Sequence, residues 1–332
     1  MGPITRYLGN EFPKAQIWQD PVPEAVYPLI NELNTENLKQ HILQSCLTIP
    51  ELINTAWASA STFRCTDRRG GANGARIRLS PQRDWRANDP TQLSLVLKTL
   101  GSIRDDFNHH HRSGVSLADM IVLGGCAAIE EAARRGGVKI LVPFSPGRTD
   151  ATPEQTDEQS FDVLEPTVDG FRNYIDANVI DLRSLEERLI DRSTMLTLTA
   201  SEMTVLVGGM RVLDANTKNS SLGVWTERPG TLSNDFFTNL LDVHTTWNPL
   251  KENDTEFEGR DDLTKKLKWK GSRVDLIFGS NSQLRSLSEY YACDDSNRLF
   301  ISDFVNAWVK VMNLDRYDLQ KKMVSIKLQS KM

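Results

Sequence analysis

A segment that is apolar on nearly every side of a helix constrains this chain more than any other feature. Ser116 is the predicted N-cap, and Asp119 completes a capping box three residues later. Gly136-Gly137 ends the segment after Arg135. The body between these limits is almost entirely apolar, so the helix has no broad face for water and must be enclosed by other elements. The sequence therefore predicts a central helix over 117–135.

Apolar residues at steps of three and four predict two further buried helices. The first stripe contains Leu93, Val96, Leu97, Leu100, Ile103 and Phe107, and the second contains Phe300, Phe304, Ala307, Trp308 and Val311. Thr199 and Glu202 form another capping box before an apolar segment that Gly208-Gly209 is expected to stop or kink. Only residues 75–79 alternate like a short strand, and 150–191 is rich in loop-forming residues. Helix dominates, so the predicted fold class is mainly α.

The two ends of the chain differ from this helical region. Five prolines before residue 29 argue against a continuous helix there: Pro3, Pro13, Pro21, Pro23 and Pro28. We therefore expect residues 1–44 to form an extended arm, residues 45–319 to form the folded domain, and residues 320–332 to form a tail. The full length of 332 residues suffices for a sizeable buried core.

Charge and hydropathy exclude two classes of partner. The formal net charge is -5, and its 39 basic and 44 acidic residues are spread along the chain, which leaves no basic stripe for nucleic acid. No run approaches the roughly 18 apolar residues that cross a membrane, and the first residues lack a signal pattern, so we expect a cytoplasmic protein. The separated cysteines are expected to be free thiols, with disulfides as the alternative in a secreted protein: Cys46, Cys65, Cys126 and Cys293.

Searches for common catalytic motifs find little. The chain has no phosphate-binding loop of the GxxxxGK type, no HExxH and no GxSxG, and no metal site is predicted. The glycine-rich run 69–76 could cradle an anion, but it follows a predicted helix, so a tight structural loop is favoured. His109, His110 and His111 share a predicted solvated loop, where they could at most hold an adventitious ion. His41 and His244 stand alone, with structural or surface roles.

Several stretches in order resemble the C-terminal half of the catalase-peroxidase family. They include TAWASASTFR at 55–64, RGGANGARIR at 69–78, VLGGCAA at 122–128, PGRTDA at 146–151, DGFRNY at 169–174, EMTVLVGG at 202–209, NDFF at 234–237, RVD at 273–275, FGSN at 278–281 and KVMNLDR at 310–316. RYLG at 6–9 and WQDP at 18–21 resemble the connector between the two halves of that family. The resemblance implies a haem-dependent peroxidase-like helical fold.

The resemblance also locates the distal side, where the active half of the family carries arginine-x-x-tryptophan-histidine. The matching residues here are Asn54, Trp57 and Ala58, and the distal asparagine matches Cys126. A peroxidase needs the histidine for proton transfer and the arginine for charge stabilisation. Only the tryptophan is retained, and core packing is the expected role of Trp57.

On the proximal side, the axial histidine that follows the glycine pair is replaced by Met210. The carboxylate that would orient this histidine matches Asp275, and the neighbouring tryptophan matches Leu232. The haem site is thus expected to be degenerate, with Met210 in the core and Asp275, beside Arg273, as a structural hydrogen-bond acceptor. Arg148 and Asp150 are expected to brace the fold through a charged pair.

These residues imply a non-catalytic domain that binds no cofactor. In the family, haem b belongs to the N-terminal domain, which the C-terminal domain would support within a homodimer or tetramer of an enzyme that removes hydrogen peroxide. Two alternatives remain open: a peroxidase that holds haem through Met210 or a loop histidine, and a stand-alone adaptor or ligand-binding protein on a degenerate peroxidase fold.

Overall fold

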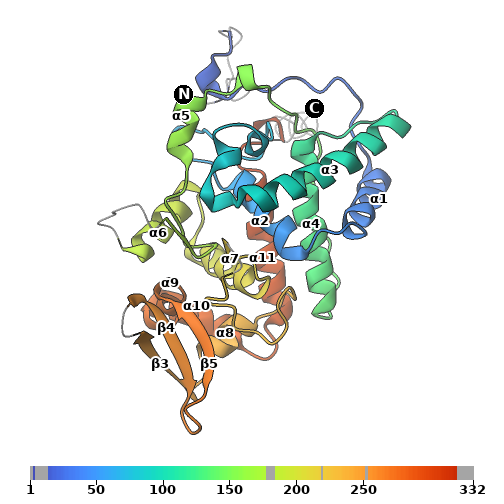
Figure 1. Ribbon diagram of the computed structural model, residues 1–332. Coiled ribbons are helices and arrows are strands. Elements are labelled where there is room, and N and C mark those ends of the chain that lie inside the picture. The colour runs from blue at the N-terminus through green and yellow to red at the C-terminus, as the bar shows by residue number, and fades with distance from the viewer. Residues whose placement is uncertain (1–2, 4–13, 177–183, 218–219, 251–252, 320–332) are drawn as a thin grey trace, which may run out of the picture.

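The computed structural model describes residues 3, 14–176, 184–217, 220–250 and 253–319, and helices dominate it as predicted (Figure 1). The α-helices are α1 (Glu32–Leu43), α2 (Ile49–Ala60), α3 (Pro90–His110), α4 (Leu117–Arg135), α5 (Glu158–Phe161), α6 (Leu185–Met195), α7 (Ala200–Val212), α8 (Asp235–Leu240), α9 (Arg273–Ser280), α10 (Ser282–Ala292) and α11 (Asn297–Met312). The strands are β1 (Val168–Asp169), β2 (Tyr174–Ile175), β3 (Thr245–Leu250), β4 (Asn253–Asp261) and β5 (Leu267–Ser272). Short 3-10 turns lie at 17–19, 76–78, 82–84, 86–88, 153–155 and 162–164.

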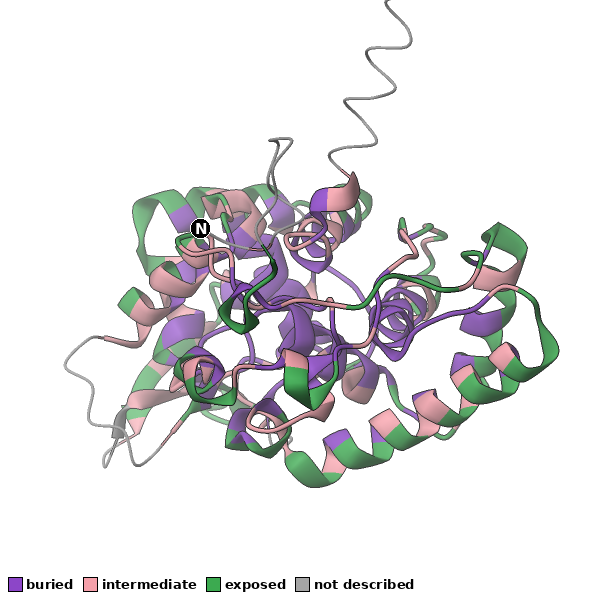
Figure 2. Ribbon diagram, turned by 90° about the horizontal axis from the view of Figure 1, so that it is seen from above, coloured by how far each residue is buried: buried purple, intermediate pink, exposed green. Residues whose placement is uncertain are grey.

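The apolar helix α4 is central, as predicted. Helices α1, α2, α3 and α11 all pack against it, and buried residues gather in the middle of the molecule (Figure 2). A Cβ on Gly125 would lie 2.8 Å from Ala56 and 2.9 Å from Trp308, so the small residue permits close helix packing. The predicted capping box is only half correct. Ser116 Oγ accepts from the Asp119 N–H, but the Asp119 carboxylate accepts from the Gly147 N–H and from Arg148 instead.

The second capping box, at Thr199 and Glu202, is present, and α7 begins there. The expectation that Gly208-Gly209 would stop this helix is wrong, because α7 continues to Val212. The glycines admit aromatic rings against the helix backbone. A Cβ on Gly209 would lie 2.2 Å from the Phe304 ring, and a Cβ on Gly208 would lie 2.5 Å from the Phe237 ring. These residues therefore serve the packing of α7 on α8 and α11.

The predicted strand at 75–79 is also wrong, since residues 76–78 form a 3-10 turn. Gly74 and Ala75 both have positive φ, which breaks an extended conformation. In the described chain, β1 and β2 form a two-stranded antiparallel sheet, and β3, β4 and β5 form a second antiparallel sheet in the order β3-β4-β5. Trp247, Gly259 and Trp269 lie opposite one another across these three strands. Figure 1 shows this sheet at the end of the molecule away from α3.

The arm prediction is wrong for residues 32–43, which form α1. All five prolines precede this helix, and the Asn31 side chain caps it by accepting from the Asn34 N–H. Residues 14–31 contain one 3-10 turn and an isolated bridge between Leu29 and Gly114, and they are held to the body through backbone carbonyls and the Asp20 side chain. Pro21 O accepts from Arg76 and Pro23 O accepts from Thr149. Most of residues 1–13 and the predicted tail lie outside the described residues.

Within the described ranges, no helix is long and apolar enough to cross a membrane. Each of the four cysteines is free.

Candidate functional site

Helix α2 carries the residues that match the distal side of the resembled family. Thr48 and Glu51 form its capping box, and Pro50 lies in its first turn. Trp57 is fully buried, and its indole Nε1 donates to Asp169 Oδ2 at 3.2 Å. Ala58 offers only its carbonyl, which accepts from Gln82 Nε2 at 3.1 Å. None of the side chains of Asn54, Trp57 and Ala58 can both take up and return a proton near neutral pH.

Asn54, which is predicted to match the distal arginine of the resembled family, borders a small cavity. Its Oδ1 atom is buried and has no hydrogen-bond partner within the described ranges. The cavity beside Asn54 and Arg172 has a volume of about 20 Å³. A space of this size holds little more than a water molecule.

A short segment, Asp169 to Arg172, lies directly against Trp57. Asp169 accepts from the Arg172 Nε at 2.7 Å and from the Phe171 N–H at 3.0 Å, and the Phe171 ring centroid lies 4.7 Å from that of Trp57. Burial raises the pKa of Asp169, but the charges of Arg172 and Arg192 outweigh burial and hold that pKa below its usual value. The carboxylate is therefore ionised and fixed by its neighbours.

The same segment contacts the proximal side through Arg211, which follows Met210 on α7. Both residues are fully buried. Arg211 donates to Phe171 O at 2.6 Å and to Gly170 O at 2.7 Å. Its Nε also donates to Asp275 Oδ1 at 2.8 Å. The segment from Asp169 to Arg172 is thus bound to Trp57 through the Asp169 carboxylate and to Arg211 through two backbone carbonyls.

Asp275 is an acceptor with several donors. Besides Arg211, it accepts from the Ser272 N–H and hydroxyl at 2.8 Å each, and from Asn173 Nδ2 at 3.3 Å. The expected role as a structural acceptor agrees with these contacts, but Arg273 is not its partner. Arg273 pairs with Glu186 instead. Asp275 caps α9 and ties this helix to α7.

The two remaining matched positions lie in the core. Cys126 is buried within α4, where burial raises the pKa of its thiol to about 12. Leu232 is fully buried, and its N–H donates to Ala132 O near the end of α4. Both side chains serve packing in this structure. Asp169, Arg172 and Arg211 were missed from the sequence, although an arginine in the apolar helix 200–212 is a signal for a buried ion pair.

Arg148 and Asp150 do not pair with each other, contrary to the prediction. Arg148 donates to Asp119 Oδ1 at 3.0 Å and to Met312 O at 2.8 Å. The Asp150 carboxylate accepts from the N–H groups of Leu117 and Ala118. An acidic side chain at a helix N-terminus satisfies free donors and the helix dipole. Each residue braces α4, but with its own partner.

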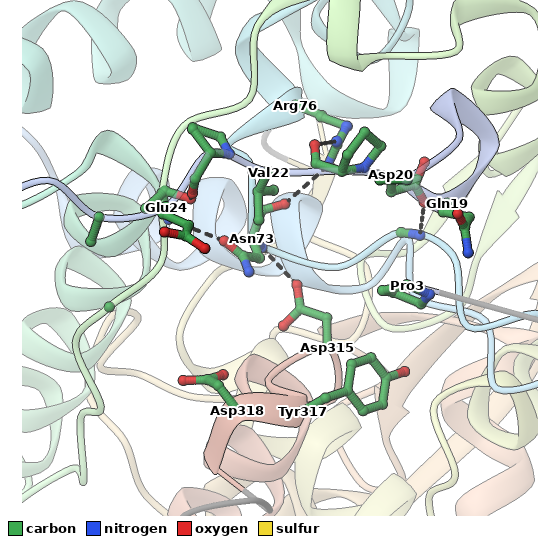
Figure 3. A pocket seen from close by; sticks show the side chains of 17 residues that line it. Pro3, Gln19, Asp20, Val22, Glu24, Asn73, Arg76, Asp315, Tyr317 and Asp318 are labelled. Atoms are coloured by element: carbon green, nitrogen blue, oxygen red, sulfur yellow. Dashed lines mark hydrogen bonds between the residues drawn. The ribbon is translucent and has the colours of Figure 1, made fainter. Parts of the chain in front are cut away.

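The glycine-rich run borders a cavity of about 300 Å³ between the arm and residues 315–318 (Figure 3). Arg69 is bound to Asp20 of the arm at 2.7 Å, and the Asn73 N–H donates to Asp315 Oδ2 at 2.6 Å. A Cβ on Gly71 would lie 2.4 Å from this same oxygen. Arg69, Gly70 and Asn73 therefore donate to carboxylates of the chain, and Arg76 donates to backbone carbonyls. These contacts support a structural loop over an anion site.

The prediction that His109, His110 and His111 share a loop is wrong for the first two. His109 and His110 belong to the last turn of α3 rather than to a loop, because the helix continues to His110. His110 Nδ1 contacts Asp106 O at 2.8 Å, and its side chain is exposed. Among the described residues, no group of three or more histidine, cysteine, aspartate or glutamate side chains could hold a metal ion.

Comparisons with known proteins agree with the motifs. A family model described as Peroxidase matches residues 35–294. Catalase-peroxidase 1 of Cupriavidus pinatubonensis is 58% identical over 321 residues, which cover 96% of this chain and 42% of that protein. Catalase-peroxidase of Syntrophotalea carbinolica and catalase-peroxidase 2 of Legionella pneumophila are each 59% identical, again over 96% of this chain and 43% of theirs. The chain therefore spans less than half the length of these relatives.

Proposed function

This chain belongs to the peroxidase family, and from this premise we propose that it is the haem-free C-terminal domain of a catalase-peroxidase. In this role the domain carries out no peroxide chemistry and supports a separate haem-bearing N-terminal half. The observation that carries the proposal is the buried ion pair of Arg211 and Asp275. In this pair, Arg211 binds the carboxylate that would otherwise orient an axial histidine.

The distal residues do not supply the groups that split peroxide. Heterolysis of the O–O bond needs a base that accepts a proton from one oxygen and returns it to the other, together with a positive charge near the leaving oxygen. Ala58 has no titratable group, and Asn54 is neutral. The indole of Trp57 is bound to Asp169. We infer that this side of the chain is catalytically silent.

The residues on the proximal side do not fit a haem group. Met210 offers a thioether that is fully buried, and the orienting carboxylate of Asp275 is held by Arg211. Phe171, in the segment between Trp57 and Arg211, contacts both of them. A porphyrin between α2 and α7 would have to displace that segment and break its buried hydrogen bonds. Leaving such groups unpaired costs several kcal/mol in total.

The support role rests on the length of the relatives and on the arm that precedes α1. The relatives contain more than twice the matched length, so a second half accompanies this domain in each of them. The arm with Trp18 and Asp20 resembles the connector of the family and is clamped to the body by Arg69. We propose that the native partner is the N-terminal haem domain of the same polypeptide, in a cytoplasmic dimer or tetramer that removes hydrogen peroxide.

Two measurements test the proposal. Titration of purified chain with haem should give no Soret band that saturates at one haem per chain. Catalase activity of a separately produced N-terminal half, which we expect to be low, should rise when this chain is added at micromolar concentration. Stoichiometric haem binding would contradict the haem-free assignment, and an unchanged activity without complex formation would contradict the support role.

A further inference from the structure

A groove beside the C-terminal end of α4 contains a carboxylate that has no hydrogen bond within the described residues. This Asp214 groove has a volume of about 520 Å³ and is bordered by Leu43, Leu47, Ile49, Arg135 and Asp214, among others. It lies where the loop between α1 and α2 meets the end of α4 and the residues after α7. No residue of the degenerate haem site borders it.

Asp214 has an uncommon conformation for a residue with a side chain. It follows the C-cap of α7, and its φ of 56° lies in the left-handed region. Glycine or asparagine is usual at this place, because other side chains are strained there. The backbone is fixed by the Asp214 N–H, which donates to Arg211 O at 2.9 Å. The carboxylate position is therefore set by the end of a buried helix.

The Asp214 carboxylate has no hydrogen bond or ion pair within the described part of the chain, and the residue is half-buried. Burial raises its pKa. A cation that binds the carboxylate would offset the water that burial removes from it.

The other charges on the groove are already paired. Arg135 donates its Nε to Glu131 Oε1 at 3.0 Å, and Arg134 contacts the same carboxylate through two nitrogens at 2.7 Å and 2.8 Å. The negative charge of Glu131 is therefore neutralised by Arg134 and Arg135. Among the charged residues that border the groove, Asp214 is the one without an ion pair in the described part of the chain.

The rest of the wall contains both apolar and polar groups, since Thr48 and Gly230 border the groove beside the leucines. Leu43 is 39% exposed, whereas Leu47, Ile49 and Leu52 are buried with their edges on the groove. Apolar surface of this kind contributes about 25 cal/mol per Å² when a ligand covers it. The groove thus offers some apolar surface beside one carboxylate that has no ion pair within the described residues.

We propose that the Asp214 groove binds a small organic cation, with an ammonium group on the Asp214 carboxylate and a hydrocarbon portion along Leu43 and Ile49. Because Arg135 is paired with Glu131, an anion would meet the unpaired charge of Asp214 and be repelled. A neutral apolar molecule would cover Asp214 and leave it unpaired. The inference is independent of the proposed function, since the site is complete within this chain.

Isothermal titration of the chain with n-hexylammonium tests the site. The expected result is saturable binding at one molecule per chain. Methylammonium, which lacks the hydrocarbon, and hexanoate, which has the opposite charge, should bind more weakly or not at all. Equal binding of hexanoate and hexylammonium would overturn the proposal, because charge would then play no part.

Two substitutions separate binding from folding. Asp214→Asn keeps the size and tolerates the left-handed region, so its melting temperature should equal or exceed that of the parent chain. Its affinity for hexylammonium should fall at least about tenfold, since a hydrogen bond to a charged group contributes about 1.5–3 kcal/mol. Asp214→Gly removes the acceptor altogether and should bind no more tightly than Asp214→Asn. Undiminished binding by both folded variants would refute the site.

Discussion

The guanidinium Nε of Arg211 lies 2.8 Å from Oδ1 of Asp275, and both side chains are fully buried. Asp275 is predicted to match the carboxylate that orients the axial histidine in the resembled family, and here its partner comes from the residue after Met210. A buried carboxylate without its histidine would be costly, and Arg211 neutralises it. The pair converts a cofactor-orienting position into a link between α7 and α9.

Removing one member of this pair should strongly destabilise the chain. Asp275→Asn leaves the Arg211 charge buried without its counter-charge, so we expect the free energy of unfolding in urea to fall by about 3–5 kcal/mol. Glu289→Gln is the matched control, because it removes the exposed pair with Arg285 and should cost less than about 0.5 kcal/mol. Similar losses in the two variants would contradict the structural role of the buried pair. If Asp275→Asn does not fold, the double variant Arg211→Met, Asp275→Leu should recover folded protein.

The Trp57 indole should contribute through its hydrogen bond as well as its packing. Trp57→Phe removes the donor to Asp169 and should lower the free energy of unfolding more than Trp308→Phe does. Trp308 is also fully buried, but its Nε1 has no partner within the described ranges, so that change removes ring volume only. The difference between the two variants is expected to be about 1.5–3 kcal/mol, the range for a hydrogen bond to a charged group. A smaller loss for Trp57→Phe would mean that the Asp169 contact adds nothing.

Acid sensitivity should include a contribution from Asp242. A hydrogen bond from Lys268 lowers the pKa of Asp242 to about 2, below its usual value of 3.8. A carboxyl whose folded pKa is depressed stabilises the fold above its unfolded pKa, and this stabilisation is lost as pH falls from about 4 to about 2. The pair is partly exposed, so the contribution is at most about 1 kcal/mol. Asp242→Asn should therefore reduce the difference in unfolding free energy between pH 5 and pH 3, as measured by urea unfolding at the two pH values.

The predictable part of this fold was the part with strong periodicity. The apolar run of α4, the stripes of α3 and α11 and the capping box of α7 each contain their own start and face signals. The sheet β3-β4-β5 was missed because its strands are half-exposed and carry lysine and glutamate, without clear alternation. Only part of the candidate site could be predicted from the sequence. Loss of the imidazoles is visible at Ala58 and Met210, but the Arg211 partner of Asp275 depends on tertiary packing between helices far apart in sequence.

Restoring the two imidazoles should not restore haem binding, and this tests whether the whole site or only its ligands has been lost. The variant Ala58→His, Met210→His places histidine at both matched positions. Asp275 remains bound to Arg211, so the new residue 210 side chain lacks its orienting carboxylate, and Phe171 still contacts Trp57 and Arg211. A haem titration followed at the Soret band should therefore show no saturation at one haem per chain, and hydrogen peroxide should not be consumed. Circular dichroism establishes that the variant is folded, and the single variant Ala58→His serves as the control. Saturable one-to-one haem binding by the folded double variant would show that a porphyrin can displace the segment from Asp169 to Arg172, and that ligand loss alone had silenced the site.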